Sequence, residues 1–202
     1  MKKYLRDYFY LITLAGAIIL LDLLTKELVR ARLQYSEIWA PWEWLMPYMR
    51  IVNWQNSGAA FGMLQGFAGV FSVLSIIVAV VIIYYFPQVS KEDWTLRLAM
   101  GMQLGGAVGN LIDRIRFDGN VTDFISIGNF PVFNVADASI SVGVAVLILG
   151  MWYKEQQEKK QIKDTAQIDS PPGSTITGQD DANRGNSISS SAPVTGSNTP
   201  DD

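Results

Sequence analysis

The run FAGVFSVLSIIVAVVIIYYF, residues 67–86, contains no charged side chain. Its length matches the roughly 20 apolar residues that an α-helix needs to cross the hydrocarbon core of a bilayer. Pro87 follows directly, and proline cannot continue the hydrogen-bond ladder of a helix. The run therefore predicts a transmembrane helix that ends at this proline.

Three further apolar segments accompany this run. They extend over residues 8–29, 96–111 and 135–153. The segment 96–111 is less apolar, but its Gly101 and Gly105 form a GxxxG pair that suits close helix packing in lipid. Four buried helices of a soluble bundle would give a similar pattern, although a soluble helix normally carries a polar face. We therefore predict an all-α membrane protein whose four transmembrane helices lie in a domain of residues 1–163.

The composition excludes several classes of chemistry. The chain contains no Cys and no His, so it cannot build a Ser-His-Asp triad, a Cys-His dyad or a zinc site of His and Cys ligands. Carboxylates, Lys, Tyr and water remain for acid–base work. The formal net charge of −3 lacks the basic excess of a nucleic-acid binder, so we expect no nucleic-acid partner.

The distribution of Lys and Arg predicts the orientation in the membrane. With four spans, both termini lie on one side, and that side carries nine basic residues against five on the other. Basic residues concentrate in the cytoplasmic loops of membrane proteins. We therefore expect both termini in the cytoplasm and the segments 30–66 and 112–134 on the outer side.

The outer segment 30–66 holds four of the six tryptophans of the chain. These are Trp39, Trp42, Trp44 and Trp54, accompanied by Tyr35 and Tyr48. Because Trp and Tyr prefer the membrane–water interface, we expect this segment to lie on the outer membrane surface. The mixture of β-branched and aromatic residues from Met49 to Trp54 predicts a short strand. A grip on an amphiphilic substrate and a simple aromatic belt are both open as roles.

The carboxyl-terminal segment, residues 164–202, differs in composition from the rest of the chain. Ser, Thr, Gly, Pro, Asn and Asp dominate it, and it contains no aromatic residue. Such a segment buries too little apolar surface to offset the entropy lost on ordering. We predict a disordered cytoplasmic tail.

Ionisable and amide side chains gather at one depth, near the outer ends of the predicted spans. They are Asp22, Lys26, Asn56, Asn110, Asp113, Arg114, Asp123, Asn134 and Asp137. Ionisable residues in membrane segments are costly and usually functional. Helix caps would explain one or two of them, but not a set drawn from several separate segments.

Two carboxylates are the hydrolytic machinery left to a chain without His or Cys. When two Asp share a site, repulsion raises the pKa of one of them and the pair holds a single proton. The ionised Asp takes a proton from water while the protonated Asp donates to the substrate carbonyl. This chemistry alone leaves open which two of Asp22, Asp113, Asp123 and Asp137 form the pair. A Mg²⁺ or Ca²⁺ site of oxygen ligands stays an alternative.

Five short motifs occur in order along the predicted spans. They are DLLTK at 22–26, NSGAAFG at 56–62, GNLIDR at 109–114, VTDFI at 121–125 and FNVAD at 133–137. Each is weak alone, but together they resemble the lipoprotein signal peptidase family, also called signal peptidase II. The resemblance covers roughly residues 10–153.

The resemblance implies a membrane aspartic endopeptidase that removes signal peptides from diacylglyceryl-modified prolipoproteins, cleaving before the lipidated cysteine. Carried over by motif, the catalytic residues would be Asp123 and Asp137. Residues that bind substrate or support the site would be Asn56, Gly58, Asn110, Arg114 and Asn134, and structural polar residues would be Asp22, Lys26 and Asp113.

The resemblance also implies a small extracytoplasmic β-like cradle between the first two spans. The location would be the cytoplasmic membrane of a bacterium, with the active site near the outer face. Prolipoproteins and membrane lipids would be the partners, and no cofactor or metal would be needed.

A small ion- or proton-coupled transport subunit is the alternative, in which Asp22, Lys26 and Asp113 would relay protons. It predicts ionisable residues spread through the membrane depth, whereas here they cluster at one face. A non-catalytic membrane scaffold, a third reading, would need neither Asp123 nor Asp137.

Overall fold

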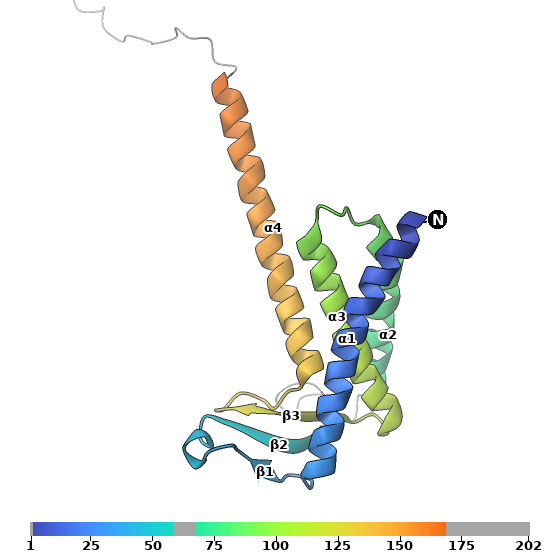
Figure 1. Cartoon of the computed structure of the whole chain (residues 1–202), viewed down its shortest axis with the longest axis vertical. Coiled ribbons are helices and arrows are strands. Elements are labelled where there is room, and N and C mark those ends of the chain that lie inside the picture. The colour runs from blue at the N-terminus through green and yellow to red at the C-terminus, as the bar shows by residue number, and fades with distance from the viewer. Residues whose placement is uncertain (1, 59–67, 169–202) are drawn as a thin grey trace, which may run out of the picture. The chain divides into compact units, whose positions relative to one another are not determined.

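The described part of the chain forms four long helices and one small sheet (Figure 1). The structure is a computed structural model that describes residues 2–58 and 68–168. The helices are α1 (Lys2–Arg32), α2 (Ala68–Tyr85), α3 (Trp94–Arg116) and α4 (Val135–Ile168), and two 3₁₀ turns are η1 (Glu43–Leu45) and η3 (Phe86–Gln88). The chain divides into two compact units, Met1–Lys160 and Gln161–Asp202. All elements belong to the first unit except the last residues of α4.

The helices extend beyond the apolar runs that predicted them. α1 begins at Lys2 rather than at residue 8, and α4 continues to Ile168 rather than ending at residue 153. Glu, Gln and Lys are good helix formers, so the polar stretch after Tyr153 prolongs α4 without any apolar pattern. Residues 164–168, expected in the tail, are therefore helical, and the rest of the predicted tail lies outside the described residues.

Among residues 2–58 and 68–168, three helices are long and apolar enough to cross a membrane. These spans are Leu5–Arg32, Ala68–Gln88 and Val135–Lys163. The predicted spans 8–29, 67–86 and 135–153 fall on them. α3 is a fourth helix of lower hydropathy, with Arg97, Asp113, Arg114 and Arg116 along its length.

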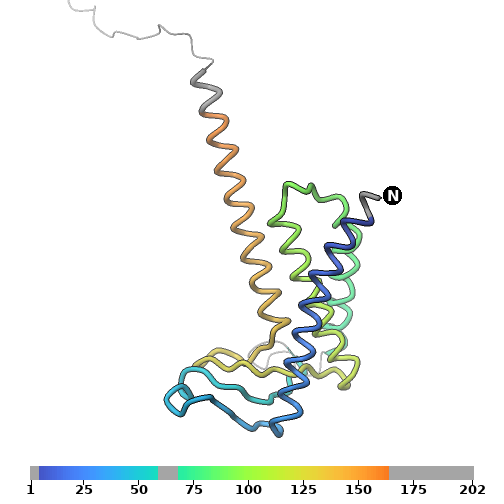
Figure 2. The backbone as a smooth tube through the Cα atoms, viewed as in Figure 1, coloured from blue at the N-terminus to red at the C-terminus, as the bar shows by residue number. Residues whose placement is uncertain are grey.

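The sheet has three antiparallel strands in the order β1 (Ile38–Trp39), β2 (Met49–Asn56) and β3 (Val121–Ile127). The strand predicted from Met49 is therefore present as β2. The predicted cradle drew only on the segment between the first two spans, but the sheet also takes β3 from the segment between α3 and α4. Figure 2 shows the β2 and β3 segments running side by side at the end of the helices opposite the N-terminus.

The pairing register between β2 and β3 brings functional side chains of the two strands close together. Trp54 pairs with Asp123 and Asn56 pairs with Val121, after an irregularity between Ile51 and Trp54. Such a bulge changes the direction of side chains along a strand. It precedes the end of β2, where Asn56 reaches the carboxylate of Asp123.

Close helix contacts explain the small residues of α3. A Cβ atom on Gly105 would lie 2.8 Å from Cβ of Ile18 in α1, and a Cβ atom on Gly106 would lie 2.5 Å from the carbonyl oxygen of Ala136 in α4. Only glycine fits at such distances. The buried core between the helices contains Leu11, Ala15, Ile82, Phe86 and Leu104.

The sheet and its connections expose an unusual number of aromatic rings. Tyr35 stacks on Trp54 with ring centroids 5.7 Å apart, and Trp42 stacks on Trp44 at 6.0 Å. All four rings are exposed. This is the arrangement expected of side chains that lie at a membrane–water interface.

Candidate active site

Asp123 is a buried carboxylate in the middle of β3. Its side chain accepts hydrogen bonds from Nδ2 of Asn134 at 2.7 Å and from Nδ2 of Asn56 at 3.0 Å. The backbone N–H of Gly58 donates to Oδ1 of Asn56 at 3.0 Å, which turns the amide group of Asn56 toward Asp123. Burial and the nearby negative charge of Asp137 raise the pKa of Asp123 to about 7.

Asp137 lies in the first turn of α4 and takes part in the cap of this helix. Asn134 precedes the helix, and its Oδ1 accepts the backbone N–H of Asp137 at 2.9 Å. In return, Oδ2 of Asp137 accepts the backbone N–H of Asn134 at 3.3 Å. This reciprocal pair is a capping box, and it fixes the carboxylate relative to the helix axis.

Two amides connect the two carboxylates. Asn110 of α3 donates from Nδ2 to Oδ1 of Asp137 at 2.7 Å. Asn134 donates from Nδ2 to Oδ1 of Asp123 at 2.7 Å and to Oδ1 of Asn110 at 3.1 Å. Side chains of α3 and of the residue before α4 thus hold the two Asp side chains at one place.

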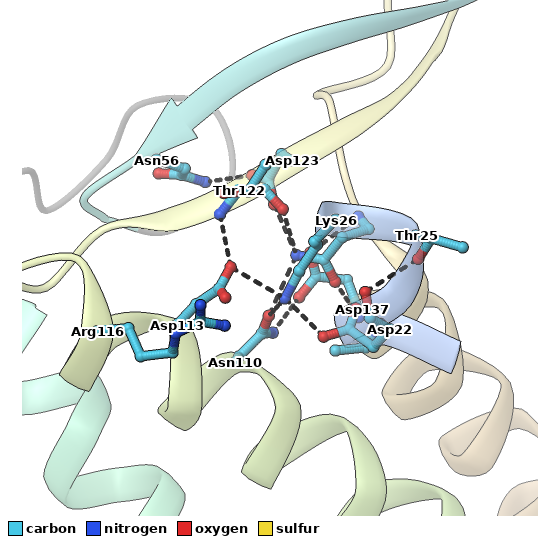
Figure 3. Close-up of polar contacts among 12 residues, drawn as sticks. Asp22, Thr25, Lys26, Asn56, Asn110, Asp113, Arg116, Thr122, Asp123 and Asp137 are labelled. Carbon is cyan, nitrogen blue, oxygen red and sulfur yellow. Dashed lines mark hydrogen bonds and ion pairs between the residues drawn. The ribbon is translucent and has the colours of Figure 1, made fainter. Parts of the chain in front are cut away.

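A buried ionic cluster lies beside the two carboxylates (Figure 3). Nζ of Lys26 is 2.7 Å from Oδ2 of Asp22 and 3.5 Å from Oδ2 of Asp113, and all three side chains are fully buried. Asp113 also accepts the backbone N–H of Thr122 at 3.0 Å, and Asp22 accepts that of Ala136 at 2.9 Å. The cluster therefore ties α1 and α3 directly to β3 and to the start of α4.

A pocket of about 670 Å³ opens next to the two carboxylates. Its polar wall contains Asn56, Gly58, Asn110, Arg114, Asp123 and Asp137. Its apolar wall comes from α2, α4 and the β3–α4 connection, with Phe71, Leu74, Val78, Phe130, Phe133 and Ile140. The guanidinium of Arg114 lies 5.5 Å from the ring of Phe71 and forms no ion pair within the described residues. The pocket thus combines a small polar end with a long apolar wall.

Every residue assigned to the site from the sequence lies in this region. The structure brings Asp123 and Asp137 together and separates them from Asp22 and Asp113, which pair with Lys26. Ala59 to Gly62 of the NSGAAFG motif lie outside the described residues.

Arg30 and Thr122 are two further residues of the site, and neither was predicted from the sequence. Arg30 donates from Nη1 to Oγ1 of Thr122 at 2.7 Å and lies 3.5 Å from Oδ2 of Asp113. Its position four residues after Lys26, on the same helix face, was the available signal.

Among residues 2–58 and 68–168, no group of three or more Asp, Glu, His or Cys side chains is placed to hold a metal ion. Lys26 occupies the space between Asp22 and Asp113, and the other two carboxylates accept hydrogen bonds from amides.

The fold and the pocket define a multi-pass membrane protein with a paired-carboxylate site between its helices and a small sheet. The sequence model of signal peptidase II matches residues 14–153, and the chain belongs to this family.

The chain is also similar to several individual relatives. It is 40% identical over 157 residues to a lipoprotein signal peptidase of Halalkalibacterium halodurans, covering 76% of this chain and 97% of that protein. It is 37% identical over 156 residues to that of Listeria monocytogenes, covering 75% and 97%. A solved bacterial membrane enzyme superposes with a TM-score of 0.66 at 27% identity, covering 73% of this chain and 90% of the other.

Proposed function

We propose that this chain is a membrane aspartic endopeptidase that removes signal peptides from diacylglyceryl-modified prolipoproteins, cutting before the lipidated cysteine. The observation that carries the proposal is the pocket in which Asp123 and Asp137 face the same space. Membership of the signal peptidase II family and the names of the relatives support the substrate class.

The environments of the two carboxylates suggest their roles. Asp123 is the more buried, and its raised pKa of about 7 favours the protonated form. We assign Asp123 as the acid that donates to the carbonyl oxygen of the scissile bond. Asp137 then takes a proton from water as the water oxygen attacks the carbonyl carbon. The resulting diol collapses, the C–N bond breaks, and the leaving nitrogen receives the proton.

The surrounding polar residues fit supporting roles. Asn56, Asn110 and Asn134 donate hydrogen bonds to the carboxylates and hold them in place. Arg114 lines the pocket and forms no ion pair with the residues that the structure describes, so we assign its N–H groups to bind a peptide carbonyl of the substrate.

The apolar wall fits the rest of the substrate. Phe71, Leu74 and Val78 lie on α2, a helix without charged residues, and extend the pocket along the membrane-crossing part of the protein. Acyl chains and the apolar region of a signal peptide are the groups that bind such a surface. The exposed rings of the sheet, including Trp42 and Trp44, would contact membrane lipids at the outer face.

We place the protein in the cytoplasmic membrane of a bacterium, with both termini in the cytoplasm and the site near the outer face. The nine-to-five distribution of basic residues supports this orientation. We include α3 as a fourth span, because it packs against α1 through Gly105 and against α4 through Gly106.

Within the part of the chain that the structure describes, the alternative of a transport subunit lacks a continuous path of ionisable groups. Buried charged side chains of the described residues form two separate groups. One surrounds Lys26 and Asp123, and the other is the pair Asp7 and Arg97 near the N-terminal end of α1. A proton relay would need groups between them.

The test is cleavage of a synthetic diacylglyceryl-modified prolipoprotein by the purified protein. Asp123→Asn and Asp137→Asn should each abolish cleavage, because Asn cannot exchange a proton. The double variant should be little worse than either single one, since residues that act as a unit are non-additive. The matched control is Asp118→Asn at an exposed turn residue with φ of 51°, a conformation that Asn also tolerates.

Added EDTA should leave activity unchanged, because the mechanism uses no metal ion. Loss of activity on chelation, or substantial activity in either single variant, would exclude the paired-carboxylate mechanism.

A further inference from the structure

Lys26 is a fully buried cation that does not line the substrate pocket. Its ammonium group has three N–H donors and no acceptor. Nζ of Lys26 donates a hydrogen bond to Oδ1 of Asn110 at 3.0 Å, and it lies 2.7 Å from Oδ2 of Asp22 and 3.5 Å from Oδ2 of Asp113. Two of these contacts are ion pairs, as a structural role requires, but the third is to a neutral amide that also contacts Asp137.

The contact with Lys26 determines the direction of the Asn110 amide. An ammonium group only donates, so the amide oxygen Oδ1 must face Lys26. The amide nitrogen Nδ2 then faces Asp137, to which it donates at 2.7 Å. With the amide reversed, two donors would face each other at Lys26, and two acceptors would face each other at Asp137.

The same direction continues to the second carboxylate. Oδ1 of Asn110, which faces Lys26, also accepts from Nδ2 of Asn134 at 3.1 Å. Nδ2 of Asn134 donates to Asp123 at 2.7 Å, which leaves its Oδ1 to accept the N–H of Asp137. A chain of oriented amides therefore leads from one buried cation to both carboxylates.

We propose that Lys26 is a positioning residue for the reaction, whose ammonium group sets the direction of the Asn110 and Asn134 amides so that each carboxylate of the pair receives an N–H donor. The inference rests on the proposed function, because it assigns Lys26 a part in the same site. It goes beyond the structural role expected from the pairing with Asp22 alone.

The charge of Lys26 provides a readout that a purely structural residue would not affect. Lys26 lowers the pKa of Asp123, against the larger effects of burial and of Asp137 that raise it. The other charged groups around these two residues are Asp22 and Arg30 of α1 and Asp113 and Arg114 of α3. Removal of the cation should raise the pKa of Asp123 further and move the alkaline limb of the pH–rate profile to higher pH.

The experiment measures cleavage of the same lipid-modified peptide by the purified full-length protein in detergent micelles. Lys26→Met keeps the length of the side chain and removes the charge and the donors. Its kcat should fall by about 10–100-fold, the range seen when groups that orient metal ligands are removed. Its KM should change little, because Lys26 does not contact the pocket.

A double-mutant cycle with Asn110 separates positioning from structural support. If Lys26 acts through the amide of Asn110, then Lys26→Met should reduce kcat little in an Asn110→Ala background. If the two residues support the structure independently, the fold-losses in kcat of the two single variants would multiply in the double variant. Multiplicative losses together with an unmoved alkaline limb would overturn the proposal.

A second pair of variants covers the case in which Lys26→Met does not fold. Asp22→Asn retains the contact between Lys26 and Asn110, whereas Asp22→Asn/Lys26→Met removes it without leaving Asp22 charged and unpaired. Asp113 keeps Arg30 as a partner in both. The proposal requires that the double variant has a lower kcat than Asp22→Asn, and that the alkaline limb of its pH–rate profile lies at higher pH. Equal profiles would overturn it, while absence of cleavage by the unmodified protein would overturn the proposed function itself.

Discussion

Asn134 and Asp137 serve two purposes with the same atoms. Their reciprocal hydrogen bonds start α4, as in any capping box, and they also hold a carboxylate of the site at the rim of the pocket. Ala136 between them is fully buried, and its N–H donates to Asp22 of α1. The position of Asp137 is therefore fixed by the cap of α4 and by the contact of that cap with α1.

The residue-scale prediction concerns the pH dependence of cleavage. Asp123 holds its proton up to about pH 7 in the folded protein, so below that value the pair has one acid to donate. As the pH rises through about 7, Asp123 ionises, the acid is lost, and kcat/KM should fall. A pH–rate profile with this lipid-modified substrate measures the limb. Activity that kept rising well above this pH would exclude Asp123 as the acid.

The same group makes a defined contribution to stability. Its ordinary pKa is 3.8, so between about pH 4 and pH 7 the unfolded chain has released a proton that the folded chain retains. The contribution of Asp123 therefore destabilises the fold as the pH rises across this window.

Asn56 donates to the ionised carboxylate of Asp123 and lowers its pKa, so Asn56→Ala should move the alkaline limb of the pH–rate profile to higher pH.

At the scale of elements, the site depends on how closely α3 approaches α4. Gly106→Ala would place a Cβ atom 2.5 Å from the carbonyl oxygen of Ala136, which is backbone and cannot rotate away. The start of α4 would have to move, and Asp137 with it. We expect a loss of about 1–3 kcal/mol in stability, as for other overpacked sites, and a larger loss of activity.

The matched control is Gly16→Ala on the exposed face of α1. No atom of the other described residues lies within 4 Å of a Cβ atom at that position, so the substitution adds a methyl group without a clash. It should be neutral or stabilising by about 0.5–1 kcal/mol, because glycine is a poor helix residue. Thermal unfolding and kcat in micelles, measured for both variants, check the prediction. Equal behaviour of the two variants would contradict it.

The sequence predicted the helices better than the sheet, and the reasons differ. α2 is a single uncharged run, so its residues alone specify a membrane-crossing helix. β3 has the β-branched residues of a strand, but its partner β2 comes from a remote part of the sequence. Asn56 of β2 and Asp123 of β3, which are in contact, are separated by 67 positions in the chain. Pairing at that distance depends on where the helices place the two segments, which local pattern does not contain.

In the site, too, the sequence predicted the residues but not the long-range contacts between them. The sequence assigned its polar residues by motif, including the pair Asp123 and Asp137. It did not predict that Lys26 would bind Asn110, or that Arg30 would reach Thr122. These contacts join residues far apart in the chain, and only the packing of α1 against α3 and β3 brings them together.

At the scale of the whole molecule, a second buried ion pair lies far from the site, near the N-terminal end of α1 (Figure 1). Arg97 of α3 donates to Asp7 of α1 at 2.8 Å and to the carbonyl oxygen of Val89 at 3.2 Å. Its guanidinium lies 4.4 Å from the ring of Phe86. The pair joins α1 and α3 to the turn that follows α2.

Arg97→Met should therefore reduce stability without altering the chemistry. It leaves Asp7 buried and unpaired, which typically costs about 3–5 kcal/mol. The thermal midpoint in micelles should fall, while kcat of the folded fraction stays near that of the unmodified protein. Asp7→Asn/Arg97→Met should recover much of the loss, because no charge is then left alone. A change in kcat with an unchanged midpoint would contradict the separation of the two ends.

The last prediction concerns the path of α3 through the membrane, on which the placement of the site depends. Ser90 is an exposed residue between α2 and α3, and Asn129 is an exposed residue between β3 and α4. If α3 is a span, these residues lie on opposite sides of the membrane, and the distribution of basic residues places Asn129 outside. The chain contains no Cys, so Ser90→Cys and Asn129→Cys each introduce a single thiol.

In right-side-out membrane vesicles, an impermeant maleimide should label Asn129→Cys directly and Ser90→Cys only after detergent is added. The reverse pattern would invert the topology and place the carboxylates on the cytoplasmic side. Labelling of both thiols from one side would mean that α3 does not cross, and the four-span arrangement would then be wrong.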